Sequence, residues 1–228
     1  MAQLKEHITN ADTIEKIVID DADTNIVIAP SQDDRIYIRY VQKAGTSYQI
    51  TEEDGALRIQ KDKKWYAVLS AATLRTNQLM VFLPEKEYQM LQAKTTNGDI
   101  HADGVFVREN VKLLTGNGEI SATLIKAGED IVLKSRNGKI EMSSLSAESR
   151  IVAKTSNDAI SFEGCDAGRL FQCHTTNGNV TGRMPESMEH YAIYSQTTNG
   201  HNNLPTEQEG PEKTIDIETG NGDIKVTF

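Results

Sequence analysis

The 228-residue sequence predicts an all-β protein: a right-handed parallel β-helix with coils of 20–22 residues and three short strands in each coil. Three observations lead to this fold class. Asn-Gly recurs at a nearly constant spacing, apolar and polar residues alternate with a period of two on both sides of it, and equivalent positions carry like residues. No segment with a helical period is available to cover a meander of hairpins. Stacked coils need no such cover, because each coil closes around its own interior.

The repeat is defined by an asparagine at a spacing of 20 residues four times and then 22 residues twice. Asn-Gly begins at each of these positions except one, where Asn-Asp is found: Asn97, Asn117, Asn137, Asn157 (Asn-Asp), Asn177, Asn199 and Asn221. A Ser or Thr stands two positions before every asparagine, and Ile or Val stands three positions after it, with Asn202 as the exception. The stacked asparagines are expected to form a hydrogen-bonded amide ladder, and the glycine to permit a positive φ at the corner.

A third inward column predicts the third strand of each coil. This column consists of Val105, Ile125, Leu145 and Cys165. The right-handed winding follows from the strong preference of parallel crossovers for that hand.

The elements can be placed in chain order from the same pattern. Residues 1–84 are predicted to form degenerate N-terminal coils or a capping β-region, with strands that alternate around Ile17, Ile26, Ile36 and Ile59. Residues 61–78 fit no column and are interpreted as a loop or a short helix, and residues 79–84 as a strand. Residues 85–228 are predicted to form seven regular coils, so that the chain is one continuous domain. Residues 183–190 and 205–213 are insertions that lengthen the later coils.

The end of the chain allows two interpretations. Ile224, Val226 and Phe228 are expected in the last strand of the seventh coil, whose unpaired backbone groups would favour a homo-oligomer through this C-terminal coil edge. Alternatively, residues 1–60 cover one end of the solenoid and residues 201–213 shield the other, since solenoids normally cap their ends.

Composition excludes several classes of function. Asp and Glu number 33 against 24 Lys and Arg, a net charge of −9 that disfavours nucleic-acid binding. No apolar run approaches the roughly 18 residues of a membrane span, and the N-terminal segment has no apolar stretch of the secretory kind. Two cysteines, Cys165 and Cys173, cannot form a disulfide framework. These features predict a cytoplasmic protein, with any membrane association made through a partner.

The search for chemistry yields two exposed columns and no catalytic, cofactor-binding or metal-ligating residue. Asp99 and Glu119 are expected to be neighbours, and two close carboxylates can bind a cation, but a solvated column of turn-flanking charges is the preferred interpretation. An outward basic column, interrupted by Leu114, could contact an anionic partner or offset the acidic column beside it. It contains Lys94, Lys134, Lys154 and His174. The five histidines lack metal-ligand spacing, and no cofactor is expected.

Several segments together resemble the bacterial putative-adhesin domain family, β-solenoid proteins of unknown function built from Thr-x-Asn-Gly-Asp-Ile units. These segments are LMVFLPEKEYQMLQAKTTNGDI, LLTGNGEI, LKSRNGKI and ETGNGDIKV. The resemblance covers roughly residues 15–228 and implies a right-handed parallel β-helix of the pectate-lyase shape. It also implies a partner near the bacterial envelope, although the sequence shows no signal peptide and no wall-anchoring tail.

The sequence therefore predicts a non-enzymatic β-solenoid, a scaffold or binding protein that presents a repetitive surface to a protein or glycan partner. The alternative is a polysaccharide-active enzyme, a lyase or hydrolase, on the same pectate-lyase-like helix. An enzyme would require a groove with clustered carboxylates and aromatic side chains, whereas a scaffold requires flat faces.

Overall fold

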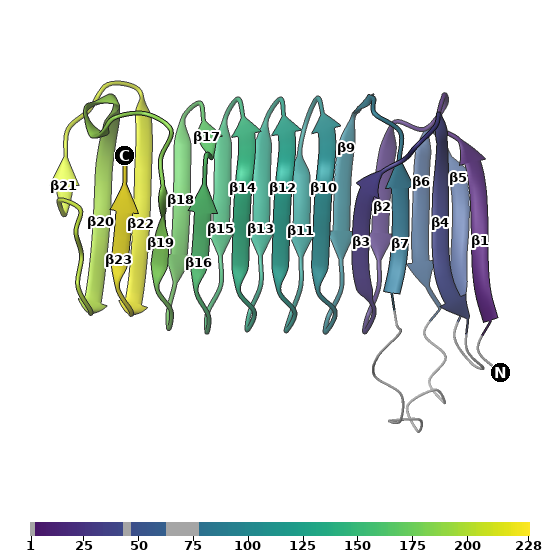
Figure 1. Cartoon of the computed structure of the whole chain (residues 1–228), viewed down its shortest axis with the longest axis horizontal. Helices are drawn as coiled ribbons and strands as arrows, with labels where there is room; N and C mark the ends of the chain where they lie inside the picture. The colour runs from purple at the N-terminus through teal and green to yellow at the C-terminus, as the bar shows by residue number, and fades with distance from the viewer. Residues whose placement is uncertain (1–2, 43–46, 63–77) are drawn as a thin grey trace.

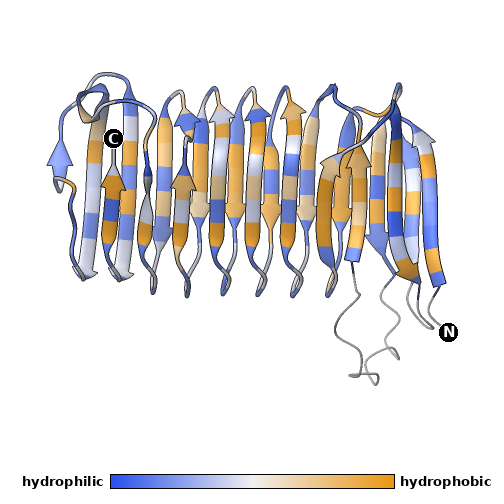
Figure 2. Ribbon diagram, viewed as in Figure 1, coloured by the Kyte–Doolittle hydropathy of each residue, from blue (hydrophilic) through white to orange (hydrophobic). Residues whose placement is uncertain are grey.

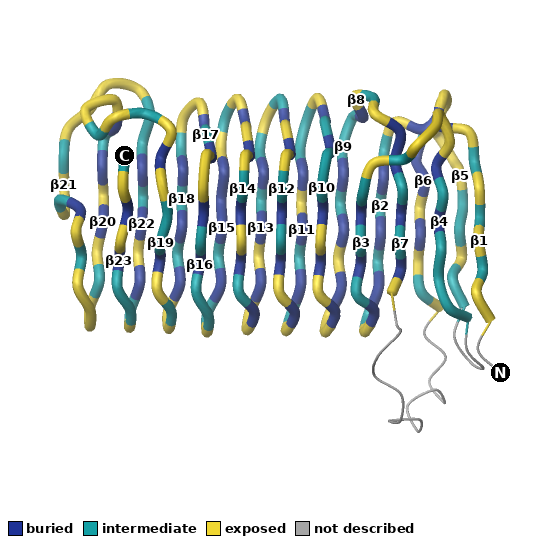
Figure 3. The backbone as a smooth tube through the Cα atoms, in the orientation of Figure 1, coloured by how far each residue is buried: buried dark blue, intermediate teal, exposed yellow. Residues whose placement is uncertain are grey.

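The computed structural model describes residues 3–42, 47–62 and 78–228, and it is an elongated stack of β-strands in two facing sheets (Figure 1). Apolar residues alternate with polar ones along the strands, so that each sheet presents an apolar face to the other (Figure 2). Buried residues recur in the strands of both sheets along the whole stack (Figure 3). Their side chains form one continuous core. The all-β prediction is confirmed.

The strands fall into a 12-stranded and an 11-stranded sheet. The 12-stranded sheet contains β1 (Gln3–Asn10), β3 (Asn25–Pro30), β4 (Arg35–Gln42), β7 (Gln78–Leu83), β8 (Glu87–Tyr88), β10 (Ile100–Val107), β12 (Ile120–Ala127), β14 (Ile140–Ala147), β16 (Ile160–Glu163), β17 (Asp166–Ala167), β19 (Val180–Arg183) and β23 (Ile224–Thr227). The 11-stranded sheet contains β2 (Lys16–Asp20), β5 (Tyr48–Glu53), β6 (Ala56–Lys61), β9 (Met90–Lys94), β11 (Val111–Leu114), β13 (Asp130–Lys134), β15 (Arg150–Lys154), β18 (Leu170–Thr175), β20 (Tyr191–Asn199), β21 (Glu207–Gln208) and β22 (Lys213–Asn221). A three-residue 3₁₀ helix, η2 (Met188–His190), lies in the first insertion.

The central coils have the register that the repeat predicts. Ile120 of β12 pairs in parallel with Ile100 of β10 on one side and with Ile140 of β14 on the other. In the opposite sheet, Val111 pairs with Leu91 and Ile131 in the same way. Like side chains therefore lie on like side chains along the stack.

Two ladders of hydrogen bonds hold the corners at the ends of β9, β11, β13, β15, β18, β20 and β22. Asparagine amides hydrogen-bond from coil to coil with Nδ2–Oδ1 distances of 2.5–3.0 Å, in the order Asn97, Asn117, Asn137, Asn157, Asn177, Asn221 and Asn199. At the start of this ladder the Asn97 amide donates to Asp23 Oδ1 at 2.7 Å. Behind it, buried hydroxyls such as Thr115 Oγ1 donate to the carbonyl of the previous turn, here Gly98 O at 2.9 Å. Both ladders satisfy polar groups that tight turns would otherwise leave unpaired.

The prediction of three strands per coil is wrong, because each central coil contributes two strands, one to each sheet. The third inward column belongs to the second half of the long strands β10, β12 and β14. In β12, Leu124 has a φ of +49°, and this residue sits between the inward Ala122 and the inward Ile125. The left-handed residue interrupts the alternation: Leu124 is exposed although the period of two would bury it, and Ile125 is buried again in the same strand. The third inward column is thus formed without a change of sheet.

The order of the coils in space differs from their order in the chain at both ends. At the N-terminal end, β2 lies between β6 and β9, and β3 lies between β7 and β10, so the chain leaves the stack and returns to it. At the C-terminal end, β22 lies between β18 and β20. The expectation that consecutive segments form consecutive coils holds for the middle of the chain and fails at its two ends.

The domain boundary after residue 84 stays a prediction. Strands β2 and β3 lie before it and pair in parallel with the regular coils, whereas β1, β4 and β5 lie before it and form antiparallel pairs at the end of the stack. The strand expected at residues 79–84 is β7. The interpretation of residues 61–78 falls, for residues 63–77, outside the described residues.

The C-terminal strand is not an open edge, which corrects the proposed route to a homo-oligomer. The outer side of β23 is paired by the segment that follows β20: Ile224 N donates to His201 O at 2.8 Å, and Asn203 N donates to Ile224 O at 3.2 Å. The Asn203 side chain completes the pairing, because its Oδ1 accepts from Val226 N at 2.9 Å and its Nδ2 donates to Val226 O at 2.8 Å. The second interpretation of the chain end, with residues 201–213 as a shield, fits these contacts.

Replacing Asn203 with alanine is expected to open the edge of β23. Both backbone groups of Val226 lose their partner, and the destabilisation should be about 1–2 kcal/mol for two hydrogen bonds. Native-state hydrogen exchange should show the Val226 amide exchanging roughly tenfold faster. Asn10→Ala at the opposite end, where the amide bonds Asp12, is the control and should leave Val226 unchanged. Unaltered protection of Val226 in Asn203→Ala would contradict the capping role.

Candidate functional site

The Asp99 side chain hydrogen-bonds to the turns on both sides of its own. Asp99 Oδ1 accepts from the Glu119 backbone N–H at 2.9 Å, and Asp99 Oδ2 accepts from Asn25 Nδ2 at 3.2 Å. Asn25 Oδ1 in turn accepts from the Asp99 backbone N–H at 3.0 Å. Asp99 and Glu119 are therefore neighbours along the stack, as the spacing predicts, but the Asp99 carboxylate is engaged with backbone and amide groups. In the described part of the chain, no group of three or more His, Cys, Asp or Glu is arranged to hold a metal ion.

The basic column forms a continuous feature on the outer face of the 11-stranded sheet, and we call it the lysine stripe. It consists of one lysine from each of four consecutive coils, Lys94 (β9), Lys112 (β11), Lys134 (β13) and Lys154 (β15). Leu114 occupies the register position between Lys94 and Lys134, and Lys112, two residues earlier on the same strand and the same face, supplies the charge for that coil. The single-column search missed Lys112. A search of the next outward column would have found it.

None of the four stripe lysines forms an ion pair with a described residue, although other lysines do. The lysine ion pairs of the described residues involve Lys61, Lys139, Lys213 and Lys225. Lys94, Lys112 and Lys134 are exposed and Lys154 is half-buried. Neighbouring strands are roughly 4.8 Å apart, so the stripe spans roughly 14 Å along the stack. An acidic chain thus presents, on one face, four positive charges that no described residue pairs.

Acidic residues lie at both ends of the lysine stripe. Asp20 of β2 pairs in register with Lys94, and Asp216 and Glu218 lie on β22, two strands beyond Lys154. His174 of β18 lies in register between Lys154 and Glu218, and its Nε2 is 3.0 Å from Asp216 Oδ1. This contact is the main cause that lowers the pKa of Asp216, so the carboxylate stays ionised. The stripe therefore has a defined length.

Aliphatic side chains share the outer face with the lysines. In the two outward rows that contain the stripe, Leu114 lies in register between Lys94 and Lys134, and Val132 lies between Lys112 and Val152, which is only 9% exposed. On a solvent-facing strand, outward positions are usually polar, because one face of a two-sheet fold meets water. The stripe therefore combines positive charge with a narrow apolar floor.

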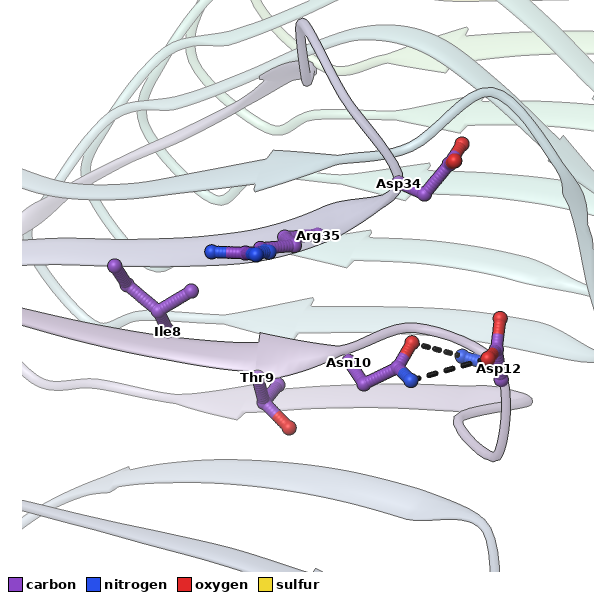
Figure 4. Close-up of a pocket in the computed structure, with 6 residues that line it drawn as sticks. All are labelled: Ile8, Thr9, Asn10, Asp12, Asp34 and Arg35. Atoms are coloured by element: carbon purple, nitrogen blue, oxygen red, sulfur yellow. Dashed lines mark hydrogen bonds between the residues drawn. The ribbon is translucent and has the colours of Figure 1, made fainter.

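Two shallow hollows lie elsewhere on the surface. One, of about 270 Å³, is on the outer face of the 12-stranded sheet and is lined mainly by hydroxyl groups together with Glu141 and Glu163. The Glu141 carboxylate is paired with Lys139. The other hollow lies at the N-terminal end, where β1 finishes and β4 begins, and Figure 4 shows Asn10 hydrogen-bonded to Asp12 with Arg35 beside Ile8. Both are solvent-open depressions without an enclosed cavity.

A buried ionic cluster closes the inward hydroxyl column at the N-terminal end. Asp21, whose side chain is 0% exposed, lies 3.3 Å from Lys61 Nζ and accepts a hydrogen bond from the Tyr48 hydroxyl. Lys61 Nζ also donates to Thr24 Oγ1 at 2.6 Å. Burial, and then the charge of Asp21, raise the pKa of Tyr48, which stays protonated and donates to the carboxylate. We assign this cluster a structural role.

The two cysteines lie in inward columns, as predicted. Cys165 and Cys173 are buried free thiols. Burial raises the pKa of Cys165 to about 11 and that of Cys173 further above its ordinary value. A thiol that is protonated and buried is unreactive and acts as a small apolar filler.

The fold and the rows on its surface define a solenoid-like repeat protein of stacked β-coils. The family model described as Toastrack DUF4097 matches residues 14–167 and 110–227, and the chain belongs to this family. The predicted resemblance to a putative-adhesin domain of unknown function is confirmed.

Solved structures are similar over the whole length of the chain. A putative cell adhesion protein from Clostridium sporogenes matches with a TM-score of 0.50 and 10% identity, and the match covers 100% of this chain and 99% of the other. A putative adhesin from Bacteroides fragilis matches with a TM-score of 0.45 and 14% identity, covering 98% and 97%. One from Parabacteroides merdae matches with a TM-score of 0.45 and 11% identity, covering 98% and 96%. At these identities the likeness concerns the fold. A search of curated proteins gave no significant match.

The described ranges 3–42, 47–62 and 78–228 contain no helix with the length and hydropathy of a membrane span.

Proposed function

We propose that this protein is a non-enzymatic binding or scaffold protein that presents a repetitive surface to a protein or glycan partner. The observation that carries the proposal is the strict coil-to-coil register, which sets outward side chains such as Lys134 and Lys154 at equivalent places on successive strands. A repeated surface of this kind suits a partner that is itself extended. The name of the Clostridium structure, a putative cell adhesion protein, supports a binding role.

The alternative is a polysaccharide-active enzyme, and its strongest support is the hollow that contains Glu141 and Glu163. Two carboxylates beside a bound sugar are the usual machinery of glycoside hydrolysis. Against this, the hollow is shallow, Glu141 is paired with Lys139, and no aromatic ring other than the buried Phe162 lines it.

The cytoplasmic location of the protein stays a prediction. Fractionation of the native cell tests it.

One experiment separates the two functions. The full chain is titrated with a panel of neutral and acidic glycans by calorimetry, and the same mixtures are assayed for new reducing ends or unsaturated sugars, with and without Ca²⁺. Binding without turnover supports the proposal. Turnover that is lost in Glu141→Gln or Glu163→Gln would establish the enzyme instead.

A further inference from the structure

We infer that the lysine stripe binds a linear acidic glycan that carries one carboxylate on each sugar ring. This inference rests on the proposed function and specifies the chemical class of its partner. It is argued from three properties of the stripe: the repeat of its charges, the floor between them, and the acidic residues at its ends.

The charge repeat fits a polymer with regularly spaced anions. The stripe offers one ammonium group per coil over four coils, from Lys94 to Lys154, at a strand spacing of roughly 4.8 Å, with Lys112 displaced by two residues along its strand. A polyuronate repeats its carboxylate once per sugar ring, a length close to that spacing. Since these lysines form no ion pair with the described residues, a ligand does not have to displace an internal carboxylate before it binds.

The apolar floor favours a sugar polymer over a purely ionic one. On this face Leu114 lies in register between Lys94 and Lys134, and Val132 lies in register beside Lys112. A pyranose ring has an apolar face of C–H groups as well as its polar substituents, and it can cover these side chains while its carboxylate meets a lysine. Polyphosphate has no apolar face and would leave the floor in water.

The acidic ends favour a narrow chain over a broad surface. Asp20 before the stripe, and Asp216 and Glu218 after it, would repel an anionic membrane that spread across the whole sheet. A single glycan chain of about four sugar rings can lie along the stripe between them. The net charge of −9 acts in the same direction, because a surface-wide anionic partner would meet repulsion from the rest of the molecule.

The experiment uses the full chain and a quadruple variant, Lys94→Gln, Lys112→Gln, Lys134→Gln and Lys154→Gln. The control variant also loses four positive charges, from positions off this face: Arg108→Gln, Lys126→Gln, Arg169→Gln and Lys225→Gln. A third variant replaces the four stripe lysines with arginine, which keeps the charge. Thermal unfolding verifies that all three fold. The probes are an oligogalacturonate, its methyl ester, a neutral glucan of the same length, polyphosphate, and vesicles that contain phosphatidylserine.

The expected result is binding of the oligogalacturonate that weakens with ionic strength, falls at least roughly tenfold in the stripe variant, and persists in the control and arginine variants. The methyl ester should bind weakly. Equal binding by the stripe and control variants, or tighter binding of the methyl ester, polyphosphate or vesicles, overturns the inference. If a neutral glycan binds and the stripe variant retains that binding, the inference fails and the proposed function stands. If no glycan in the panel binds, the inference fails, and the proposed function then depends on a protein partner.

Discussion

Replacing Asp21 with alanine is expected to destabilise the N-terminal end of the stack by about 3–5 kcal/mol, the usual cost of removing one partner from a buried ion pair. The side chains of Asp21 and Lys61 are 0% and 9% exposed, so the ammonium group left behind has little access to water. Asp21 Oδ1 also accepts from the backbone N–H groups of Ala22, Asp23 and Thr24, and these turn bonds are lost at the same time. Urea denaturation together with hydrogen exchange of β2 and β6 measures the effect.

Two further variants separate the ion pair from the turn. Asp21→Asn keeps an oxygen for the three backbone N–H groups but removes the charge opposite Lys61, so it should be destabilised less than Asp21→Ala. Adding Lys61→Met to Asp21→Ala removes the unpaired ammonium group and should recover part of the lost stability, since neighbouring residues do not act additively. The free energy lost in Asp21→Ala and in Lys61→Met is measured singly and compared with that of the double variant. If the two losses simply add, Asp21 and Lys61 are not coupled and the assignment of the cluster is wrong.

The repeat could be predicted because each coil obeys the same local constraints. An inward Ile or Val three positions after the asparagine, and a buried hydroxyl two positions before it, recur at every corner except the one at Asn199, so they are visible in the sequence. The third strand was predicted wrongly because an inward column shows only that a position is buried. It does not show whether the chain has turned a corner or has passed a left-handed residue such as Leu124 or Ser144, which restores the inward direction within one strand.

The order of the coils at the ends could not be predicted from the same pattern. All coils carry apolar residues at the same positions, so each coil could pack against any other. The sequence pattern therefore does not show which coil is the neighbour of which. Strand β22 has Ile215 and Ile217 at core positions that fit against either neighbour, and it inserts between β18 and β20. The capping of β23 at Val226 depends on a single side chain, that of Asn203, and the repeat pattern does not predict it.

For the candidate site, the sequence identified most of the charged residues but not which of them lie side by side or which are hydrogen-bonded. Lys94, Lys134 and Lys154 could be placed on one face from spacing alone. Lys112 was missed because it lies in another column, and the pairing of Asp99 with backbone and amide groups depends on how closely two turns approach.

The second large effect is expected from Gly138→Ala, in the turn between β13 and β14. A Cβ atom there would lie 1.9 Å from the carbonyl oxygen of Gly118 and 2.4 Å from its carbonyl carbon. Both are backbone atoms of the turn below, so the stacked turns have to separate. The cost should be about 3 kcal/mol, the upper end of ordinary overpacking, and urea denaturation would report it as a lower midpoint. The separation should also lengthen the contact between the Asn117 and Asn137 amides, which are 2.5 Å apart.

The chain supplies a matched control in Gly164→Ala. Gly164 has a φ of +61°, and a Cβ added there would lie 3.9 Å from Ser144 Oγ, an ordinary van der Waals contact. Leu124 and Ser144 occupy the equivalent positions of earlier coils with similar φ angles, so a side chain is accommodated there, at about 1–2 kcal/mol for the left-handed conformation. One turn carries Asp158 where the other turns have glycine, and Asp158 is partly exposed whereas Gly138 is buried. An alanine at 138 that cost no more than an alanine at 164 would show that the turns are not in close contact, and that turn stacking does not determine the coil spacing.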